Sequence, residues 1–474
     1  MEDKDNEIIV STHDTFSSSD IVQLIDKKDI ANLRTFIMEH KAVDIAQVLE
    51  DMSLRNILFI FKTVKSEYTA EIFSYLENDL QQDIANGLSD EEVHDLVDEL
   101  STDDLVDFVE DLPANLVKKI LQTTNRNDLN RRVTINAFLR FKKDSAGSIM
   151  TTEFVELKAG MKASDALKRI REVGRDAETI SSLFVIDSSR HLVGVLYLDE
   201  LIFSNEDTII DEIMNDDFLS VTTEDDREDV ATLFKKYDIQ VMPVVNKEQR
   251  LVGIITIDDI MDVIEDETTE DIQKMAGTTP VTTPYLKTSI LKLASSRIVW
   301  LLVLMVSATL TGLIISKFEF LIAAIPVLSS FIPMLMDTSG NAGNQSTTTI
   351  TRALAVGDIG IKDYWHVALK EVAVGLLTGL VIALFNFAWI LVELNIGIIK
   401  NTSTVASWLI ALQVSLTLYI IIVLAKFLGA SLPMLGKLIH VDPALMAGPL
   451  ITTILDTISL ILYFILAKAI IPGL

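Results

Sequence analysis

The chain of 474 residues contains no cysteine, and only 6 of its residues are histidine. Without cysteine there are no disulfide bonds, no thiolate–metal centres and no thiol nucleophile. The sequence also lacks a Walker A loop, a His-Glu-x-x-His run and a Gly-x-Ser-x-Gly elbow, and His366 and His440 stand alone. These absences argue against an enzyme.

Positive charge is scarce in the first part of the chain. Residues 286–474 hold 11 Lys and Arg against 8 Asp and Glu, a net charge of +3, so the whole-chain charge of −28 leaves −31 on residues 1–285. Such an acidic surface does not suit nucleic acid or anionic lipid, which attract Lys and Arg. It suits hard divalent cations, which take oxygen ligands, although acidic surfaces also serve solubility alone.

The first residues, Met1–Ile8, show no positive segment followed by an apolar core, which is the pattern of a signal peptide. We therefore expect residues 1–285 to stay in the cytosol. Residues 1–20 are expected to be a flexible N-terminus.

A helical repeat is predicted over residues 21–140. Ser89 and Glu92 have the spacing of a capping box, which starts a helix. Short capped helices with one apolar stripe cannot bury that stripe alone, so the units are expected to stack into an acidic α-solenoid. An apolar residue recurs every 12 positions, at Met52, Val64, Leu76, Leu88, Leu100 and Leu112.

A second repeat, of mixed helix and strand, lies within residues 145–268. Phe184–Ile202 aligns with Pro243–Met261, 59 residues later, and both halves predict strand, polar turn, strand and an acidic helix start. An amphipathic helix is expected before each, near Ala163–Val173 and Glu228–Tyr237. The pattern resembles a tandem pair of CBS domains, which are α/β regulatory modules, here at about 145–206 and 207–268.

Long apolar stretches follow a connecting helix region predicted within residues 269–295. Each approaches or exceeds the ~20 residues that span a bilayer core, so residues 296–474 are predicted to form an all-α pore domain of five transmembrane helices. The stretches free of charge are 298–316, 320–336, 372–392 and 401–425, and only Asp456 interrupts 443–467.

Lysine and arginine set the expected orientation in the membrane. Eight basic residues fall on flanks predicted to be cytosolic and three on the other side, in agreement with the positive-inside rule. An odd number of spans then places the C-terminus outside. The cytosolic set is Lys287, Lys292, Arg297, Arg352, Lys362, Lys370, Lys426 and Lys437.

Asp456 is the only ionisable side chain in the last span and lies near its middle. A carboxylate at such a depth costs roughly 2.5–3.5 kcal/mol on insertion scales, so it is expected to face a pore, a partner or water. A structural aspartate that is hydrogen-bonded within the helix bundle is the alternative.

The segment Asp337–Thr349 is polar, and its amides and hydroxyls cannot face lipid unsatisfied. Gly340 and Gly343 would let backbone carbonyls approach an ion or a neighbouring helix, and Asn341 and Asn344 offer neutral oxygens. Mg²⁺ gives up its hydration water reluctantly, so such oxygens with one carboxylate per subunit suit a hydrated ion. Close helix packing through small residues is the alternative.

The polar segment and several other motifs resemble the MgtE family of magnesium channels, and the order of the domains agrees over essentially the whole chain. The resemblance implies a homodimer in a bacterial plasma (inner) membrane that takes up Mg²⁺ through a pore on the two-fold axis. The motifs are Gly340–Ser346, Arg352–Ala355, Lys370–Gly375, Val441–Leu445 with Asp456, and Asp176–Ile180 in the first CBS repeat.

The resemblance also assigns residues. Asp456, Gly340, Asn341 and Asn344 match pore positions, and Asp337 departs from the glycine usual in relatives, where it adds charge at the pore mouth or turns away. Carboxylates crowded across domain faces repel at low Mg²⁺ and are bridged at high Mg²⁺, so Mg²⁺ is expected to close the channel. The regulatory positions, between the N domain, the CBS pair, the connecting helix and the membrane base, are Asp226, Glu228, Asp238, Asp259, Asp262, Glu267, Glu270, Asp271 and Asp442.

Adenine nucleotide (ATP) is a further candidate ligand of the CBS pair. In such modules the ribose is commonly held by an Asp three residues after a Ser or Thr, the spacing of Thr256 and Asp259. The first repeat has Tyr197 and Glu200 at these positions, which argues against a nucleotide site there.

Other functions fit part of the pattern. A proton-coupled transporter would need several ionisable groups within the membrane, and only Asp456 lies deep in a span. Softer metals would need His, Cys or Met within the polar segment Asp337–Thr349, which contains none of them. A CBS sensor that conducts nothing would not need Asp456.

Overall fold

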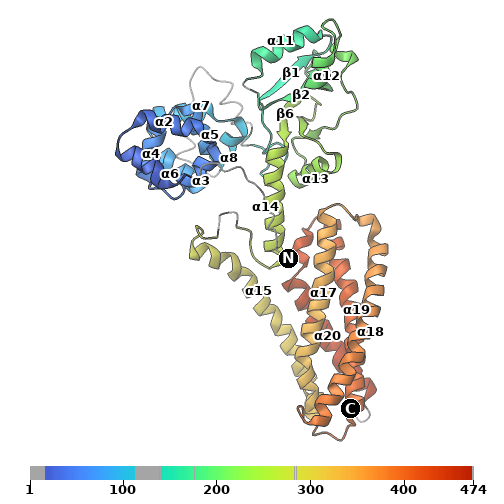
Figure 1. Ribbon diagram of the computed structural model, residues 1–474. Coiled ribbons are helices and arrows are strands. Elements are labelled where there is room, and N and C mark those ends of the chain that lie inside the picture. Colours follow the sequence, from blue (N-terminus) through green and yellow to red (C-terminus); the bar gives the residue numbers. More distant parts are fainter. Residues whose placement is uncertain are drawn as a thin grey trace, which may run out of the picture. The chain divides into compact units, whose positions relative to one another are not determined.

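The computed structural model describes residues 16–110, 112, 138, 140–175, 177–281, 283 and 285–471. It forms two compact units, residues 1–261 and 262–474 (Figure 1). Residues 1–15 of the expected flexible N-terminus, Asp176 of the resemblance and most of 113–139 in the predicted N domain lie outside the described residues.

Short helices build the first part of unit 1, as predicted. Val64, Leu76, Leu88 and Leu100, four positions of the 12-residue repeat, lie in the turns between helices and are at most 7% exposed. Alternate helices stack, α3 on α5, α5 on α7 and α4 on α6, which buries the stripes that no single helix could cover. The helices are α1 (Ser18–Asp26), α2 (Ile30–Glu39), α3 (Ala42–Leu49), α4 (Leu54–Thr63), α5 (Ser66–Ser74), α6 (Asn78–Gly87), α7 (Asp90–Glu99) and α8 (Thr102–Glu110).

The predicted capping box is present at the start of α7. Ser89 Oγ accepts from the Glu92 amide at 3.3 Å, and Glu92 Oε2 accepts from the Ser89 amide at 2.8 Å. The two bonds satisfy amides that the first helical turn leaves without partners.

The CBS repeat is also confirmed. Each half forms a three-stranded sheet in which the first pair of strands is parallel and the second antiparallel, in the orders β1-β2-β3 and β4-β5-β6. The first half contains β1 (Phe154–Lys158), α11 (Ala163–Val173), β2 (Thr179–Ile186), β3 (Leu192–Tyr197), α12 (Leu198–Phe203) and η1 (Ile210–Glu212). The second contains β4 (Val221–Thr222), α13 (Arg227–Tyr237), β5 (Val241–Val245), β6 (Leu251–Thr256) and α14 (Ile257–Met275).

Helix α14 runs without a break through residue 268, where the sequence predicted the CBS pair to end. The boundary between the two units also falls within this helix, after Met261. Helix α14 is therefore both the last helix of the second CBS half and the start of the connecting helix region.

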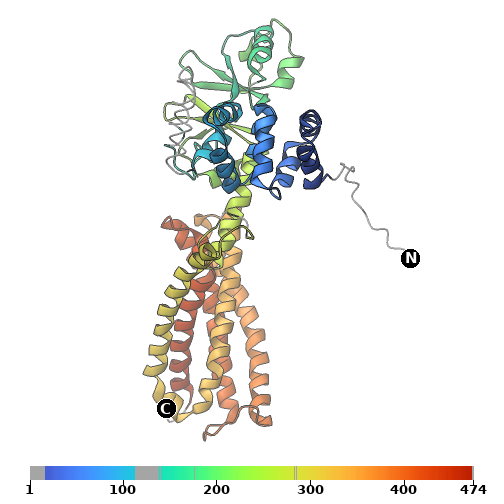
Figure 2. The same cartoon turned by 90° about the vertical axis from the view of Figure 1, so that its left-hand side faces the viewer.

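In unit 2 the long helices α17 to α20 form a bundle (Figures 1 and 2), whereas α15 runs obliquely beside it in Figure 1. Helix α18 packs on α19, α17 packs on both α19 and α20, and α15 packs on α20. The elements are α15 (Ile290–Lys317), α16 (Glu319–Ala324), η2 (Pro326–Phe331), α17 (Ile332–Ala355), η3 (Ile361–Asp363), α18 (Tyr364–Ile396), α19 (Ser407–Leu438), η4 (Pro443–Met446) and α20 (Pro449–Ile470).

Four helical segments within the described residues are long and apolar enough to cross a membrane: 290–317, 361–396, 407–438 and 443–470. The second predicted span, 320–336, is wrong as a helix, because Pro326 begins a 3-10 turn and Pro333 stands in the first turn of α17. Helix α17 replaces the predicted second span, and with α15, α18, α19 and α20 it makes five long helices within the described residues. Because the middle of α17 is polar, it is not one of the four apolar segments.

Candidate ion pathway and regulatory residues

Helix α17 carries an exposed row of polar side chains, Asp337, Asn341, Gln345 and Thr348, which we call the polar row. Their spacing of four, four and three residues places them on one face of the helix. The opposite face is buried in the bundle and includes Ser339, Gly340, Gly343, Ser346 and Thr347. A polar row on a membrane helix cannot be left against lipid, so this face requires water, an ion or another polar surface.

Gly340 and Gly343 serve helix packing. A Cβ atom on Gly340 would lie 2.8 Å from Cγ2 of Thr452, and one on Gly343 would overlap Leu455, both on α20. Because the segment is helical, its backbone carbonyls are engaged within α17, and the Gly343 carbonyl also accepts from Thr347 Oγ1 at 3.0 Å. The packing alternative therefore describes these glycines better than carbonyl ligation does.

Three consecutive residues tie α17 to three different neighbours. Asn344 Oδ1 accepts from the Gly448 amide before α20 at 2.8 Å, Gln345 Oε1 accepts from Lys426 Nζ of α19 at 3.0 Å, and Ser346 Oγ donates to Glu371 Oε2 of α18 at 2.5 Å. Successive side chains of a helix point about 100° apart, so three in a row can reach three helices. Asn344 is therefore bonded within the bundle and is not part of the polar row, whereas Asn341 is exposed on it.

Asp456 lies on α20 and is half-buried. Its Oδ1 atom is buried and has no hydrogen-bond partner among the described residues, and the carboxylate of Asp337 repels it. A buried carboxylate oxygen without a donor is costly. Oδ1 therefore lacks the hydrogen bond that a purely structural aspartate would be expected to make. A cation or its hydration water would satisfy this oxygen.

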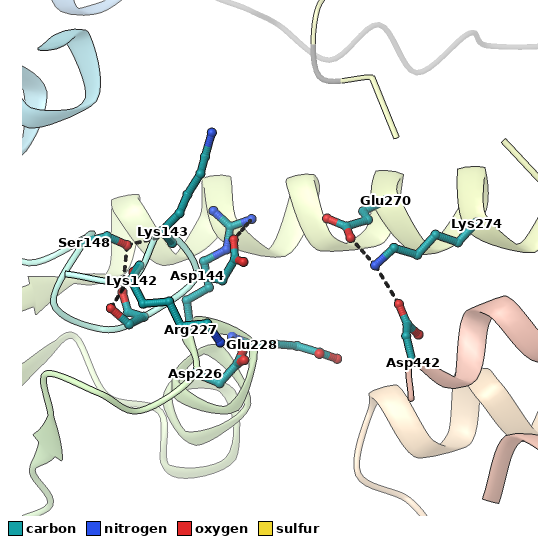
Figure 3. A network of polar contacts seen from close by, with 11 residues as sticks. Lys142, Lys143, Asp144, Ser148, Asp226, Arg227, Glu228, Glu270, Lys274 and Asp442 are labelled. Carbon is teal, nitrogen blue, oxygen red and sulfur yellow. Dashed lines mark hydrogen bonds and ion pairs between the residues drawn. The ribbon is translucent and has the colours of Figure 1, made fainter. Parts of the chain in front are cut away.

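Four of the predicted regulatory residues lie in unit 1. Asp226 caps α13, where its Oδ1 accepts from the Glu228 amide at 3.0 Å (Figure 3). Asp238 ends the same helix in a left-handed conformation with φ 52°. Asp259 Oδ2 accepts from the Thr256 hydroxyl at 2.7 Å. All but Asp259 are exposed.

The other five lie in unit 2, and three of them gather around one lysine. Lys274 Nζ donates to Asp442 Oδ2 at 2.6 Å and also contacts Glu270 Oε1 (Figure 3). Asp271 is on the same turn of α14, and Glu267 is close enough to repel it. Asp262, also on α14, is exposed. Within the described residues no three His, Asp or Glu side chains are placed to hold a metal ion, so the carboxylates do not form a ready-made site.

The lysine and the carboxylates change each other's protonation. Burial raises the pKa of Asp271 to about 6, and repulsion by Asp442, Glu267 and Glu270 adds to the rise. Burial lowers the pKa of Lys274, but its bonds to Asp442 and Glu270 outweigh that effect and leave the pKa raised. The ammonium is therefore the resident positive charge of an otherwise acidic cluster.

The end of α14 touches the start of α20 through two glycines. Gly448 has φ 55°, and a Cβ atom there would overlap the carbonyl oxygen of Met275. Gly277, with φ 70°, lies against Pro449, 2.8 Å from its Cγ when a Cβ is added. The Gly448 amide is also the donor to Asn344, so one turn of backbone contacts both α14 and the helix with the polar row.

The CBS pair has a cavity of about 620 Å³ that is lined by Tyr197, Glu200, Tyr237 and Asp238, among others. Tyr197 and Glu200 are the two first-repeat residues that argue against a nucleotide site there. Thr256 is 6% exposed and bonds to Asp259, and neither lines this cavity. Nucleotide binding by Thr256 and Asp259 stays a prediction.

Three residues were missed from the sequence. The sequence predicts Lys426 on a cytosolic flank, whereas α19 continues to Leu438 and the lysine is only 6% exposed within the bundle. Lys274 and Gly448 carry no sequence prediction. Lys274 follows Glu270 at the four-residue spacing of helical ion pairs, which could have indicated it, whereas the contact of Gly448 with α14 has no local signal.

Comparison with protein families gives three matches along the chain. Residues 332–466 match the family described as MgtE, divalent cation transporter, and residues 40–144 match the MgtE intracellular N domain. Residues 146–205 and 210–266 each match the CBS domain.

Individual relatives agree with this assignment. A protein named magnesium transporter MgtE from Thermus thermophilus is 37% identical over 72% of this chain and 73% of its own length. A protein of the same name from Enterococcus faecalis is 35% identical over 70% and 71%. A crystal structure described as the soluble part of a magnesium transporter is 28% identical, covers 53% of this chain and 97% of its own, and has a TM-score of 0.50.

Proposed function

The chain belongs to the MgtE family of divalent cation transporters, and from this premise we propose that it is a Mg²⁺ channel closed by cytosolic Mg²⁺. The observation that carries the proposal is the buried Oδ1 of Asp456, which has no hydrogen-bond partner among the described residues. Mg²⁺ is the transported ion here and not a resident cofactor.

The polar row supports the same pathway. Asp337 and Asn341 offer oxygens on the exposed face of α17, and Asp337 acts electrostatically on Asp456 of α20. Mg²⁺ keeps most of its water, and oxygen acceptors suit the outward-pointing hydrogens of that water. The pathway proposed here therefore binds a hydrated ion through Asp456 together with Asp337 and Asn341 of the row.

A second copy of the chain would cover the polar row. One helix face cannot enclose an ion, and the row is exposed in a single chain, where lipid would leave its groups unsatisfied. A homodimer with the pore on its two-fold axis would bring two rows and two Asp456 carboxylates together. We place the N-terminal domains in the cytosol and the C-terminus outside a bacterial plasma membrane.

Closure by Mg²⁺ is proposed to act through the nine regulatory carboxylates named above. Among them Glu270, Asp271 and Asp442 are already gathered in unit 2. An ion that binds these groups better in the closed state shifts the population toward it. The contact of α14 with Gly448 gives such binding a direct connection to α20.

The test is Mg²⁺ uptake by purified protein in liposomes that contain a Mg²⁺-sensitive dye. Wild type is expected to give uptake that depends on the protein, and Asp456→Ala to lose most of it while size-exclusion chromatography shows an unchanged dimer. Ser459→Ala is the matched control, because Ser459 is also buried on α20 with an oxygen that has no partner among the described residues. Near-normal uptake by the Asp456 variant would exclude this carboxylate from the pathway.

A further inference from the structure

Lys426 is a buried charge that the proposed pathway does not use. It lies on α19 and is 6% exposed, and its stem rests on α18, where a Cβ atom on Gly375 would be 3.3 Å from Lys426 Cβ and Cγ. The missing side chain at Gly375 thus makes room for the lysine. Burying an ammonium costs several kcal/mol in general, so its position needs a reason.

The partner of Lys426 is on the polar row. Nζ donates to Gln345 Oε1 at 3.0 Å, and Gln345 is exposed between Asn341 and Thr348. A lysine ammonium has three donors and no acceptor, so it fixes the glutamine amide with its oxygen toward the bundle. The NH₂ group of Gln345 is then the part left for the exposed face.

A negative charge also acts on the lysine. Glu371 of α18 interacts electrostatically with Lys426 and accepts from Ser346, the residue after Gln345. The carboxylate is held at the buried face of α17, whereas the amide that Lys426 orients is on the exposed face. The two opposite charges are therefore bonded to consecutive residues of α17, the lysine to Gln345 and the glutamate to Ser346.

We propose that Lys426, acting through Gln345, is a positioning residue that makes one level of the ion pathway electropositive and so weakens cation binding there. This inference rests on the proposed pore. Asp337 and Asp456 attract a cation, and Gln345, two helical turns from Asp337, presents N–H groups backed by an ammonium. Conduction requires that an ion leave as well as bind, and a weak level next to a strong one allows this.

Removing the positive charge and removing the negative charge should change the half-maximal Mg²⁺ concentration in opposite directions. Lys426→Met keeps most of the stem, removes the ammonium and frees Gln345 Oε1 to turn outward, so the Mg²⁺ concentration at half-maximal uptake should fall. A unit charge roughly 8 Å from a divalent ion in a water-like dielectric changes the affinity about fivefold, and the maximal rate should fall with tighter retention. Glu371→Gln removes the offsetting charge, so the half-maximal concentration should rise.

The experiment measures initial Mg²⁺ uptake over a range of Mg²⁺ concentrations in liposomes, for wild type, Lys426→Met, Lys426→Arg and Glu371→Gln. Lys426→Arg keeps the charge and should keep the wild-type half-maximal concentration. A purely structural role of the lysine would lower the maximal rate without tightening binding. A lower half-maximal concentration in Lys426→Met together with a higher one in Glu371→Gln supports the inference.

A half-maximal concentration that is unchanged or higher in Lys426→Met overturns the inference, whatever Glu371→Gln shows, while uptake by wild type leaves the pore proposal standing. If Lys426→Met does not yield folded protein, Glu371→Gln decides alone, since an unchanged or lower half-maximal concentration contradicts the electropositive level. Wild type without uptake would overturn the pore proposal and this inference together.

Discussion

Lys274 of α14 and Asp442, the residue before η4, are joined by a hydrogen bond of 2.6 Å between Nζ and Oδ2. The residues are 168 positions apart in the chain, and the same ammonium contacts Glu270. Asp442 also accepts from the Ala444 amide through Oδ1 at 2.8 Å. A lysine thus holds the last turns of α14 to the segment before α20.

Lys274→Met should lower the stability of the metal-free protein, because Glu270, Asp271 and Asp442 then repel one another without a cation. The loss is expected to be about 1 kcal/mol, or a fall of about 2–4 °C in the thermal midpoint. Adding Mg²⁺ should recover more stability in the variant than in wild type. Thermal unfolding of the detergent-solubilised protein in EDTA and in Mg²⁺ measures both.

The control for this variant is Lys247→Met, which removes the same charge from an exposed pair with Glu224. It should leave the midpoint unchanged. An equal recovery by Mg²⁺ in all three proteins would show that the ion does not replace Lys274 at these carboxylates.

Glu267→Gln, Glu270→Gln and Asp271→Asn together should shift closure to higher Mg²⁺ without blocking the pore. Moving a two-state equilibrium from 1:99 to 99:1 needs ~5.5 kcal/mol of differential binding, and several sites of ~1 kcal/mol each would supply it. Uptake inhibited by Mg²⁺ on the cytosolic side gives the closure curve. Limited proteolysis between residues 130 and 290 should show protection that increases with Mg²⁺ in wild type.

The matched triple variant is Glu212→Gln, Asp216→Asn and Asp217→Asn, which removes the same charge from exposed residues of the CBS pair. It should close at the wild-type Mg²⁺ concentration. The sensing mechanism would be abandoned if the α14 triple variant did the same, or if wild type gained no protection.

Asp271 should make the metal-free protein less stable as the pH rises. Its pKa in the folded chain is raised to about 6 from 3.8, so between these values the folded state binds more protons than the unfolded state. Stability contributed by the protonated form is complete below about pH 4 and is lost as the pH passes through 6. Thermal midpoints in EDTA from pH 4.5 to 7.5 should show a fall that is smaller in Asp271→Asn, and parallel curves would contradict the assignment.

Gly448→Ala should be strongly destabilising for two reasons. The residue has φ 55° and ψ −121°, which side chains rarely adopt, and its Cβ would overlap the Met275 carbonyl. A cost of about 1–3 kcal/mol is expected. Gly312→Ala is the control, because a Cβ there has nothing within 4 Å and α15 should tolerate or gain from alanine. The thermal midpoints of the two variants are compared. Equal midpoints would show that the end of α14 moves away from residue 448 at little cost, which would contradict the prediction.

Local patterns were sufficient for most of the architecture. The 12-residue repeat predicted stacked helices, the 59-residue repeat predicted two α/β modules, and the apolar stretches predicted long membrane helices. Each of these patterns can be read from neighbouring residues along the chain, without knowledge of tertiary contacts. The second span was misplaced because absence of charge says nothing of where a helix starts, and Pro326 and Pro333 decided that.

The candidate site divides in the same way. Asp456 and the polar segment could be found from the sequence, since a carboxylate and amides within an apolar region conflict with lipid wherever the chain folds. Whether Gly340 faces an ion or Thr452, and whether Lys426 ends a span or bonds to Gln345, depends on which helix packs beside α17. The sequence alone determined the chemistry available in the membrane domain, and only the tertiary structure decided which groups meet, because contacts between residues more than 80 positions apart leave no periodic trace in either segment.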